Sequence, residues 1–236
     1  DGKKVFKVKA KVVRKQSNAG DGQNDGGAKN EKENNLVDKS EKLKKKSNEK
    51  LKKYGAQSNF VEFDFNDTYV KDIGVEKALN DVMKKFPKSI LKECFTDLDG
   101  VVFIDREIAA SNPLGAYDNK KNKIYIRVNH DAFLNNELEN VNVSAVLAHE
   151  IGHRIDEDVL NSASRTPKFI KIYNEEMKAL SSVTKTTYGE KNPEEFFAEV
   201  VQCMFSTNSK QQEGVRAHTP QAVKFIEEKL KELKEK

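Results

Sequence analysis

The segment from Asn142 to Val159 constrains the fold more than any other, because its apolar residues recur at helical spacing. Those residues are Val143, Val146, Leu147, Ile151 and Ile155. The same segment contains LAHEIGHRIDE, in which His149, Glu150 and His153 form an HExxH motif. Histidines four residues apart project from one face of a helix, so they can bind a single metal ion. The segment therefore predicts a helix with a core side and a metal-binding side.

Zinc is the metal that this motif favours. Neutral imidazoles suit zinc when no thiolate ligand is at hand. Glu150 lies beside the pair, where its carboxylate can take a proton from a zinc-bound water. The alternative is a chance match on an ordinary amphipathic helix, which is rare in a chain with 4 histidines. We predict one zinc ion at His149 and His153, whereas His130 and His218 have no partner at ligand spacing and are interpreted as structural or surface residues.

A catalytic zinc needs a third protein ligand and an open position for water. The best candidates lie in YGEKNPEEFFAEVVQCMF, where Asn192 and Pro193 open another helix. Glu195 falls in the first turn and shares a face with Glu199, four residues on. A capping-box role for Glu195 remains an alternative, since it lies three residues after the cap. Two phenylalanines follow it, however, and a carboxylate that enters a core needs a partner such as a metal.

From about residue 59 onward, the pattern predicts an α+β domain. VEKALNDVMKKF (75–86) has helical spacing, and VVFID (101–105) and KIYIRV (123–128) are typical of strands. Further helices are predicted to begin at Thr166–Pro167, Asn192–Pro193 and Thr219–Pro220. A helix, short strands and then several helices favour a small sheet with a helical C-terminal part.

Residues 1–58 differ from the rest in charge. They hold 17 Lys and Arg against 8 Asp and Glu, whereas the remainder holds 25 against 30. We interpret them as a basic N-terminal arm with a possible strand at 5–13, a disordered linker at 16–35 and a Lys-rich helix at 36–54. The domain is predicted to span 59–236. A basic arm on an acidic body is not the pattern of a nucleic-acid-binding domain, so no nucleic-acid partner is expected.

Composition excludes other classes. No run of about 18 apolar residues exists, so no membrane-spanning helix is predicted. The chain opens on DGKKVFKVKAKVV, which is not a signal peptide, so the signal of an exported protein has been removed or is not included in this sequence. Cys94 and Cys203 are too few for a disulfide scaffold, and we interpret them as two buried or idle thiols.

Two segments of the chain resemble the catalytic domain of anthrax lethal factor-like zinc metallopeptidases, which include the secreted Pro-Pro endopeptidases. They are HEIGHRID and, after a gap of about thirty residues, TTYGEKNPEEFFAEVVQCMFSTN. The resemblance covers roughly 59–236 and is tight around 145–156 and 186–206. It implies a zincin-like metalloprotease fold. It also implies Glu195 as the third zinc ligand, Tyr188 as a catalytic residue that stabilises the oxyanion, and Glu199 as a residue that orients a histidine.

The function implied is that of a secreted, monomeric zinc endopeptidase, a bacterial protease or toxin component, that binds its protein substrate in extended form. KIYIRV (123–128) is either the sheet edge along which a peptide would lie or a plain interior strand, and both readings stay open. The alternative from another class is a non-catalytic binding or toxin-subunit module that docks a partner through the basic arm. The intact Glu150 argues against it. The sequence does not indicate the cleavage specificity, which could be for a Pro-Pro motif, for a kinase or for another substrate.

Overall fold

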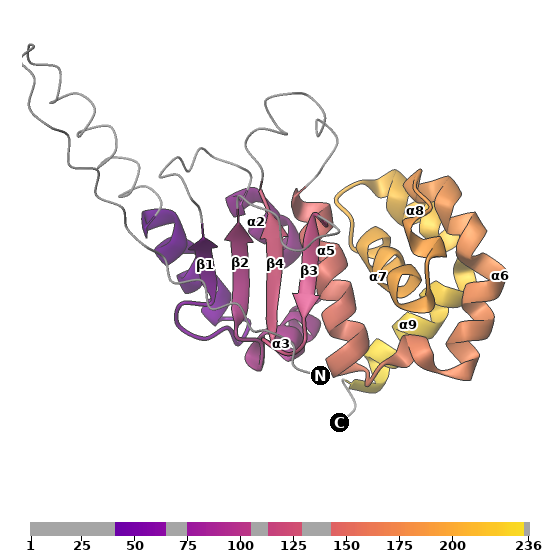
Figure 1. Cartoon of the computed structure of the whole chain (residues 1–236), viewed down its shortest axis with the longest axis horizontal. Helices are drawn as coiled ribbons and strands as arrows, with labels where there is room; N and C mark the ends of the chain where they lie inside the picture. The colour runs from indigo at the N-terminus through magenta and orange to yellow at the C-terminus, as the bar shows by residue number, and fades with distance from the viewer. Residues whose placement is uncertain (1–40, 65–74, 105–112, 129–142, 234–236) are drawn as a thin grey trace, which may run out of the picture.

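A computed structural model describes residues 41–64, 75–104, 113–128 and 143–233. A small sheet forms one side of the molecule, several helices form the other, and α5 (Val143–Arg154) runs between them (Figure 1). The α+β class predicted from the order of elements is confirmed. The predicted strand at 5–13, the linker at 16–35 and His130 lie outside the described residues.

The sheet has four strands in the order β1-β2-β4-β3. β1 (Val61–Asp64), β2 (Gly100–Ile104) and β4 (Lys123–Arg127) are parallel, and β3 (Gly115–Asp118) is antiparallel to β4. The predicted strands at 101–105 and 123–128 are therefore present as β2 and β4. KIYIRV forms β4, which is paired on both sides, so it is an interior strand and not an edge strand. The edge strand that lies beside α5 is β3.

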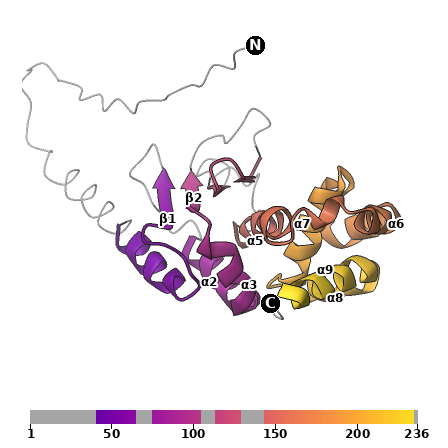
Figure 2. The ribbon, with the colours of Figure 1, turned by 90° about the horizontal axis from the view of Figure 1, so that it is seen from below.

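One face of the sheet is covered by α2 (Val75–Lys85), α3 (Lys88–Thr96) and a helix over residues 41–52 (Figure 2). Alternate strand residues enter the core on this side. They are Val101, Phe103, Ile124 and Ile126. α2 also packs against α5, so the helix with the HExxH motif is fixed from behind.

The helix over 41–52 belongs to this core although its sequence is rich in lysine. Leu51 is fully buried, and the side-chain carbonyl of Asn48 accepts the N–H of Val61, the first residue of β1, at 2.7 Å. Lys50 pairs with Glu76 of α2 at 3.1 Å. Residues 41–52 thus pack with the domain that the sequence analysis begins at 59, and we propose a domain boundary on the N-terminal side of residue 41.

The C-terminal helices begin where proline follows a capping residue. α6 (Pro167–Thr184), α7 (Pro193–Met204) and α9 (Pro220–Glu232) each have proline in the first turn, as predicted. α8 (Ser209–His218) lies between the last two. The short 3₁₀ helices η2 (Ala163–Arg165) and η3 (Tyr188–Glu190) connect this part, and α7 packs along α5.

The predicted helix at 142–159 has one unexpected feature. α5 ends at Arg154, and Ile155–Val159 continue as a π-helix, η1. Arg154 is buried there, and its guanidinium bonds the hydroxyl of Tyr117 on β3 at 3.0 Å. The end of the motif helix is thereby tied to the edge strand.

Neither cysteine forms a disulfide, and both are buried, as the sequence suggested. Burial raises the pKa of each thiol to about 12. Among the described residues, no helix is both long and apolar enough to cross a membrane.

Candidate metal centre

The two histidines of the motif meet on one face of α5. Their Nε2 atoms lie 3.1 Å apart, and both side chains are largely buried. Burial lowers the pKa of His149, which favours the neutral imidazole that binds metal. Burial on its own would lower the pKa of His153, but the hydrogen bond that its imidazole donates to Glu195 and the nearby Glu150 carboxylate outweigh burial and raise this pKa.

Glu195 reaches the histidines from α7. One carboxylate oxygen, Oε2, lies 3.1 Å from His149 Nε2 and 3.2 Å from His153 Nε2. Burial on its own would raise the pKa of Glu195, yet the two imidazoles hold it well below its ordinary value. Within the described part of the chain, these three are the one cluster of three or more His, Cys, Asp or Glu side chains that could hold a metal ion.

The spacing of these donors fits zinc. Tetrahedral zinc with bonds of about 2.0–2.1 Å places its ligand atoms about 3.3 Å apart. The three separations here, 3.1, 3.1 and 3.2 Å, are close to that value. Two imidazoles and one carboxylate are also a donor set that leaves a fourth position for water. A zinc ion would therefore need only small shifts of the side chains.

The first turn of α7 explains which glutamate enters the site. Asn192 caps the helix and accepts the backbone N–H of Glu195 at 2.8 Å, so this N–H is satisfied. The Glu195 carboxylate lies against the imidazoles, whereas a capping-box glutamate would reach back to the cap. Glu194 turns away and pairs with Arg165 on the surface at 2.8 Å.

Glu150 lies between the histidines and the sheet edge. Burial raises the pKa of Glu150 to about 7, against its neighbour His153, which lowers it. The backbone N–H of Tyr117 on β3 hydrogen-bonds this carboxylate. The Glu150 side chain fits beside β3 only because residue 115 is glycine: a Cβ there would lie 2.5 Å from Glu150 Oε1. The edge strand thus holds Glu150 in place through backbone contacts.

Tyr188 begins η3 and borders the histidines from the opposite side. Its ring centroid is 5.6 Å from that of His149, and its hydroxyl bonds Glu195. Burial and the negative Glu195 raise the pKa of Tyr188 to about 12, so the phenol keeps its proton and can donate it in a hydrogen bond. The ammonium of Lys191 lies 3.5 Å above the Tyr188 ring.

Glu199 does not make the contact expected from the resemblance. Its carboxylate bonds the hydroxyl of Thr186 and the N–H of Gly189, which belong to the Tyr188 turn. Besides Glu195, the side chain of Gln202 lies against His149 and raises the pKa of its imidazole, a contact that was not predicted from the sequence. The position of Gln202 seven residues after Glu195, two turns along the same helix, was the available signal. His218 is exposed on α8, as predicted.

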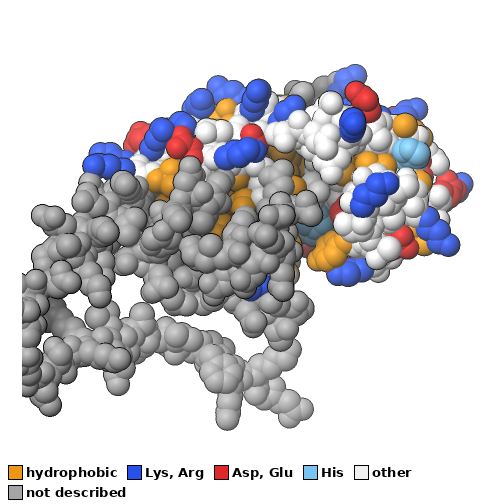
Figure 3. Space-filling model, turned by 90° about the horizontal axis from the view of Figure 1, so that it is seen from above, with side chains coloured by type: hydrophobic (Ala, Val, Ile, Leu, Met, Phe, Trp, Pro, Cys, Tyr) orange, Lys and Arg blue, Asp and Glu red, His pale blue; other side chains and the backbone are white. Residues whose placement is uncertain are grey.

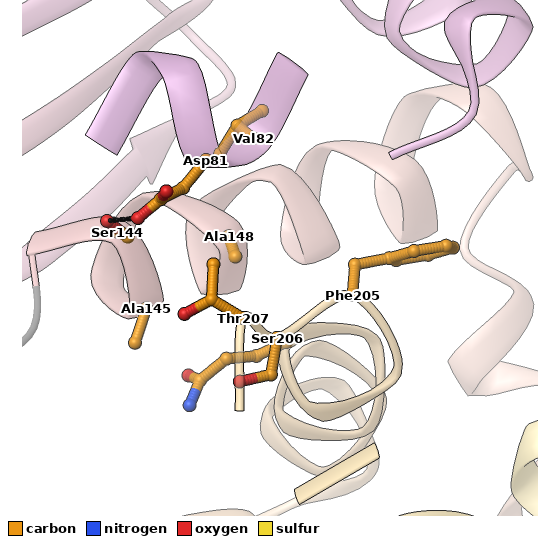
Figure 4. Close-up of a pocket in the computed structure, with 9 residues that line it drawn as sticks. Asp81, Val82, Ser144, Ala145, Ala148, Phe205, Ser206 and Thr207 are labelled. Atoms are coloured by element: carbon orange, nitrogen blue, oxygen red, sulfur yellow. Dashed lines mark hydrogen bonds between the residues drawn. The ribbon is translucent and has the colours of Figure 1, made fainter. Parts of the chain in front are cut away.

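Two hollows lie near the place where α5 packs against α7. On the face seen in Figure 3, histidine surface lies at the bottom of a depression flanked by apolar side chains. Behind α5, a small pocket is lined by α2, α5 and the end of α7, with Ser144 bonded to Asp81 at 2.7 Å (Figure 4). Gln202 also lines this pocket, so it lies between the pocket and His149.

The chain is similar to known proteins. Residues 114–229 match the family described as anthrax toxin lethal factor, N- and C-terminal domain. This part of the chain therefore matches the lethal factor family. Lethal factor of Bacillus anthracis is 32% identical over 98 residues, which cover 38% of this chain and 12% of that protein. The chain therefore matches only a small part of this relative's length.

A solved structure shares the fold. The Pro-Pro endopeptidase PPEP-2 from Paenibacillus alvei aligns with a TM-score of 0.51 and 18% identity. The alignment covers 72% of this chain and 95% of PPEP-2. The chain thus has a metallopeptidase-like fold, and the resemblance stated from the motifs is confirmed.

Proposed function

We propose that this lethal factor family domain is a zinc-dependent endopeptidase that holds one zinc ion through His149, His153 and Glu195. The observation that carries the proposal is the triangle of two imidazole nitrogens and one carboxylate oxygen, 3.1–3.2 Å apart. The match to the lethal factor family and the metallopeptidase-like fold support it.

The surrounding residues suit peptide hydrolysis. Zinc would polarise the scissile carbonyl and acidify a water molecule. Glu150, with a pKa raised to about 7, is matched to taking a proton from that water and returning it to the leaving amine. Tyr188 remains protonated, so its hydroxyl can donate to the oxyanion that develops in the transition state.

The substrate is proposed to bind in extended form along the edge of β3. Arg127 donates its N–H to Leu114, so in this antiparallel pair Ala116 also faces β4. The backbone groups of Gly115 and Tyr117 therefore point away from the sheet, toward α5. The N–H of Tyr117 is occupied by Glu150, so an extended peptide would pair by strand addition with the remaining outward backbone groups of this edge. This assigns to β3 the role that KIYIRV was considered for.

The biological setting is proposed by analogy with the relatives. Lethal factor is named as an anthrax toxin component and PPEP-2 as a Pro-Pro endopeptidase. A secreted bacterial protease or toxin component, acting as a monomer, is the corresponding setting for this domain. Pro-Pro bonds are the first candidates for cleavage.

Turnover of a peptide library tests the proposal. The library should contain Pro-Pro sequences and matched sequences with one proline replaced, and products should be identified by mass spectrometry. We expect cleavage that a zinc chelator abolishes, that added zinc restores and that Glu150→Gln lacks. A zinc-loaded protein that cleaves no member would favour the non-catalytic binding module.

A further inference from the structure

We infer that Glu199 is a positioning residue for Tyr188, whereas Gln202 serves the metal ligand His149. The inference rests on the proposed function, because it assigns Tyr188 a role in that reaction. It separates two tasks on the same helix, α7, which also carries Glu195.

Glu199 fixes the backbone on both sides of the Tyr188 residue. Its Oε2 accepts the N–H of Gly189 at 3.2 Å, and its Oε1 accepts the hydroxyl of Thr186 at 3.1 Å. That same hydroxyl oxygen accepts the N–H of Tyr188 at 3.1 Å. Two consecutive N–H groups of the turn are thus attached to one carboxylate, directly or through a single hydroxyl.

The fit between the carboxylate and the turn is close. Glu199 is buried, with 5% of its surface exposed, and a Cβ on Gly189 would lie 2.8 Å from Glu199 Oε2. Only a residue without a side chain lets the backbone approach the carboxylate this closely. A buried carboxylate needs hydrogen-bond donors, and the Tyr188 turn supplies those that the structure shows.

The turn is anchored to a second helix as well. The hydroxyl of Tyr173 on α6 donates to the carbonyl of Glu190 at 2.7 Å, and Ser181 donates to its carboxylate at 2.6 Å. These contacts fix the far end of η3. Glu199 fixes the near end relative to α7, and therefore relative to Glu195, one helical turn away. The distance between the phenol and the metal ligands thus depends on Glu199.

Gln202 acts at another place. Its side chain bonds His149 and lines the pocket behind α5 together with Ala145 and Ala148. A hydrogen bond to the second nitrogen of a metal-binding imidazole sets ring orientation and ligand strength. Loss of Gln202 should therefore lower zinc affinity, whereas loss of Glu199 should alter the position of the Tyr188 side chain.

The test compares Glu199→Gln, Gln202→Leu and the surface control Glu194→Gln in the full chain. For Glu199→Gln we expect kcat to fall roughly tenfold to a hundredfold, with KM and zinc content near those of the unmodified protein. Adding Tyr188→Phe to the Glu199→Gln protein should lower kcat only slightly further, because both substitutions remove the same function, that of the Tyr188 hydroxyl. Gln202→Leu should weaken zinc about tenfold or more.

Hydrogen exchange gives a readout that does not depend on activity. In both metal-free and zinc-loaded protein, Glu199→Gln should speed amide exchange in the peptide that contains residues 186–190 by about tenfold, because the hydrogen bonds from Gly189 and Thr186 to the carboxylate are lost or weakened. Gln202→Leu and Glu194→Gln should leave that peptide unchanged. Unchanged exchange in Glu199→Gln, or rate losses of Glu199→Gln and Tyr188→Phe that multiply independently, would overturn the inference. If no peptide is cleaved at all, the exchange result still decides it.

Discussion

The closest approach of α5 and α7 offers a sharp test of how the metal site is built. Gly152 lies between the two histidines on α5 and contacts Ala198, which lies between Glu195 and Glu199 on α7. A Cβ on Gly152 would lie 2.9 Å from the Cα and 3.0 Å from the carbonyl oxygen of Ala198. Ordinary contacts are about 3.5–4.0 Å. Gly152→Ala must therefore push the helices apart by about 0.5–1 Å, the gap between those values.

The expected effect on stability is small because two terms oppose each other. Overpacking a core contact costs about 1–3 kcal/mol. Replacing glycine within a helix by alanine contributes about 1 kcal/mol in favour of the folded state. The free energy of unfolding of the metal-free protein should thus fall by about 0–2 kcal/mol, the difference of these two terms.

The effect on zinc should be larger. Zinc sites tolerate deviations of about 0.2 Å in ligand distance, and a shift of about 0.5 Å moves Glu195 beyond that limit. We expect zinc affinity to fall by roughly tenfold to a hundredfold, as when an outer contact of a ligand is lost. Chelator competition measures this, and urea denaturation of the metal-free protein gives the stability.

A matched control lies on α8. Gly214→Ala would place a Cβ 3.0 Å from a methyl group of Val183, a similar contact but with a side chain and away from the metal centre. It should leave zinc affinity unchanged. If Gly152→Ala binds zinc as tightly as the unmodified protein while remaining folded, the close approach of the helices does not place Glu195.

Four further experiments test the site and the domain boundary. Glu150→Gln should keep zinc and lower kcat by about 10²–10⁴-fold, as measured on a cleaved peptide; near-normal turnover would contradict the role of base. Glu195→Ala should lose zinc, and Glu194→Ala should keep it, by metal analysis; the opposite result would mean that the wrong carboxylate was chosen. Tyr188→Phe should reduce kcat by about a hundredfold without loss of zinc, whereas an unchanged kcat would leave the ring a packing role. A chain that begins at residue 59 should be less stable by about 2–5 kcal/mol than one that begins at 41, because it loses the buried Leu51; equal melting temperatures would restore the boundary at 59.

Local geometry explains which parts of the site could be predicted from sequence. His149, Glu150 and His153 lie within one helical turn or so, and helix geometry converts their spacing directly into a shared face. The sequence made Glu195 a candidate, but its choice as third ligand leaned on the family resemblance, because it lies 42 positions after His153 and the chain between them passes through α6 and η3. The structure brings these residues together in the arrangement expected, and ligation remains a proposal.

Contacts that depend on tertiary approach could not be predicted. GAYD (115–118) was not predicted as a strand, because it is short and begins with glycine; it becomes β3 through pairing with β4. The helix over 41–52 was assigned to the arm because of its charge. Its lysines lie outside and pair with acidic partners such as Glu76, while its thin apolar stripe is enough to reach the core.

The buried thiols have a consequence for the conditions in which the domain can work. The thiolate is the form that attacks disulfides and reacts with oxidants, and a pKa of about 12 leaves almost none of it at neutral pH. The candidate metal ligands are nitrogen and oxygen atoms, which do not enter thiol exchange. Neither the core nor this centre should then sense the redox potential of its surroundings. A protein of this design can pass from a reducing to an oxidising compartment without gaining or losing a bond.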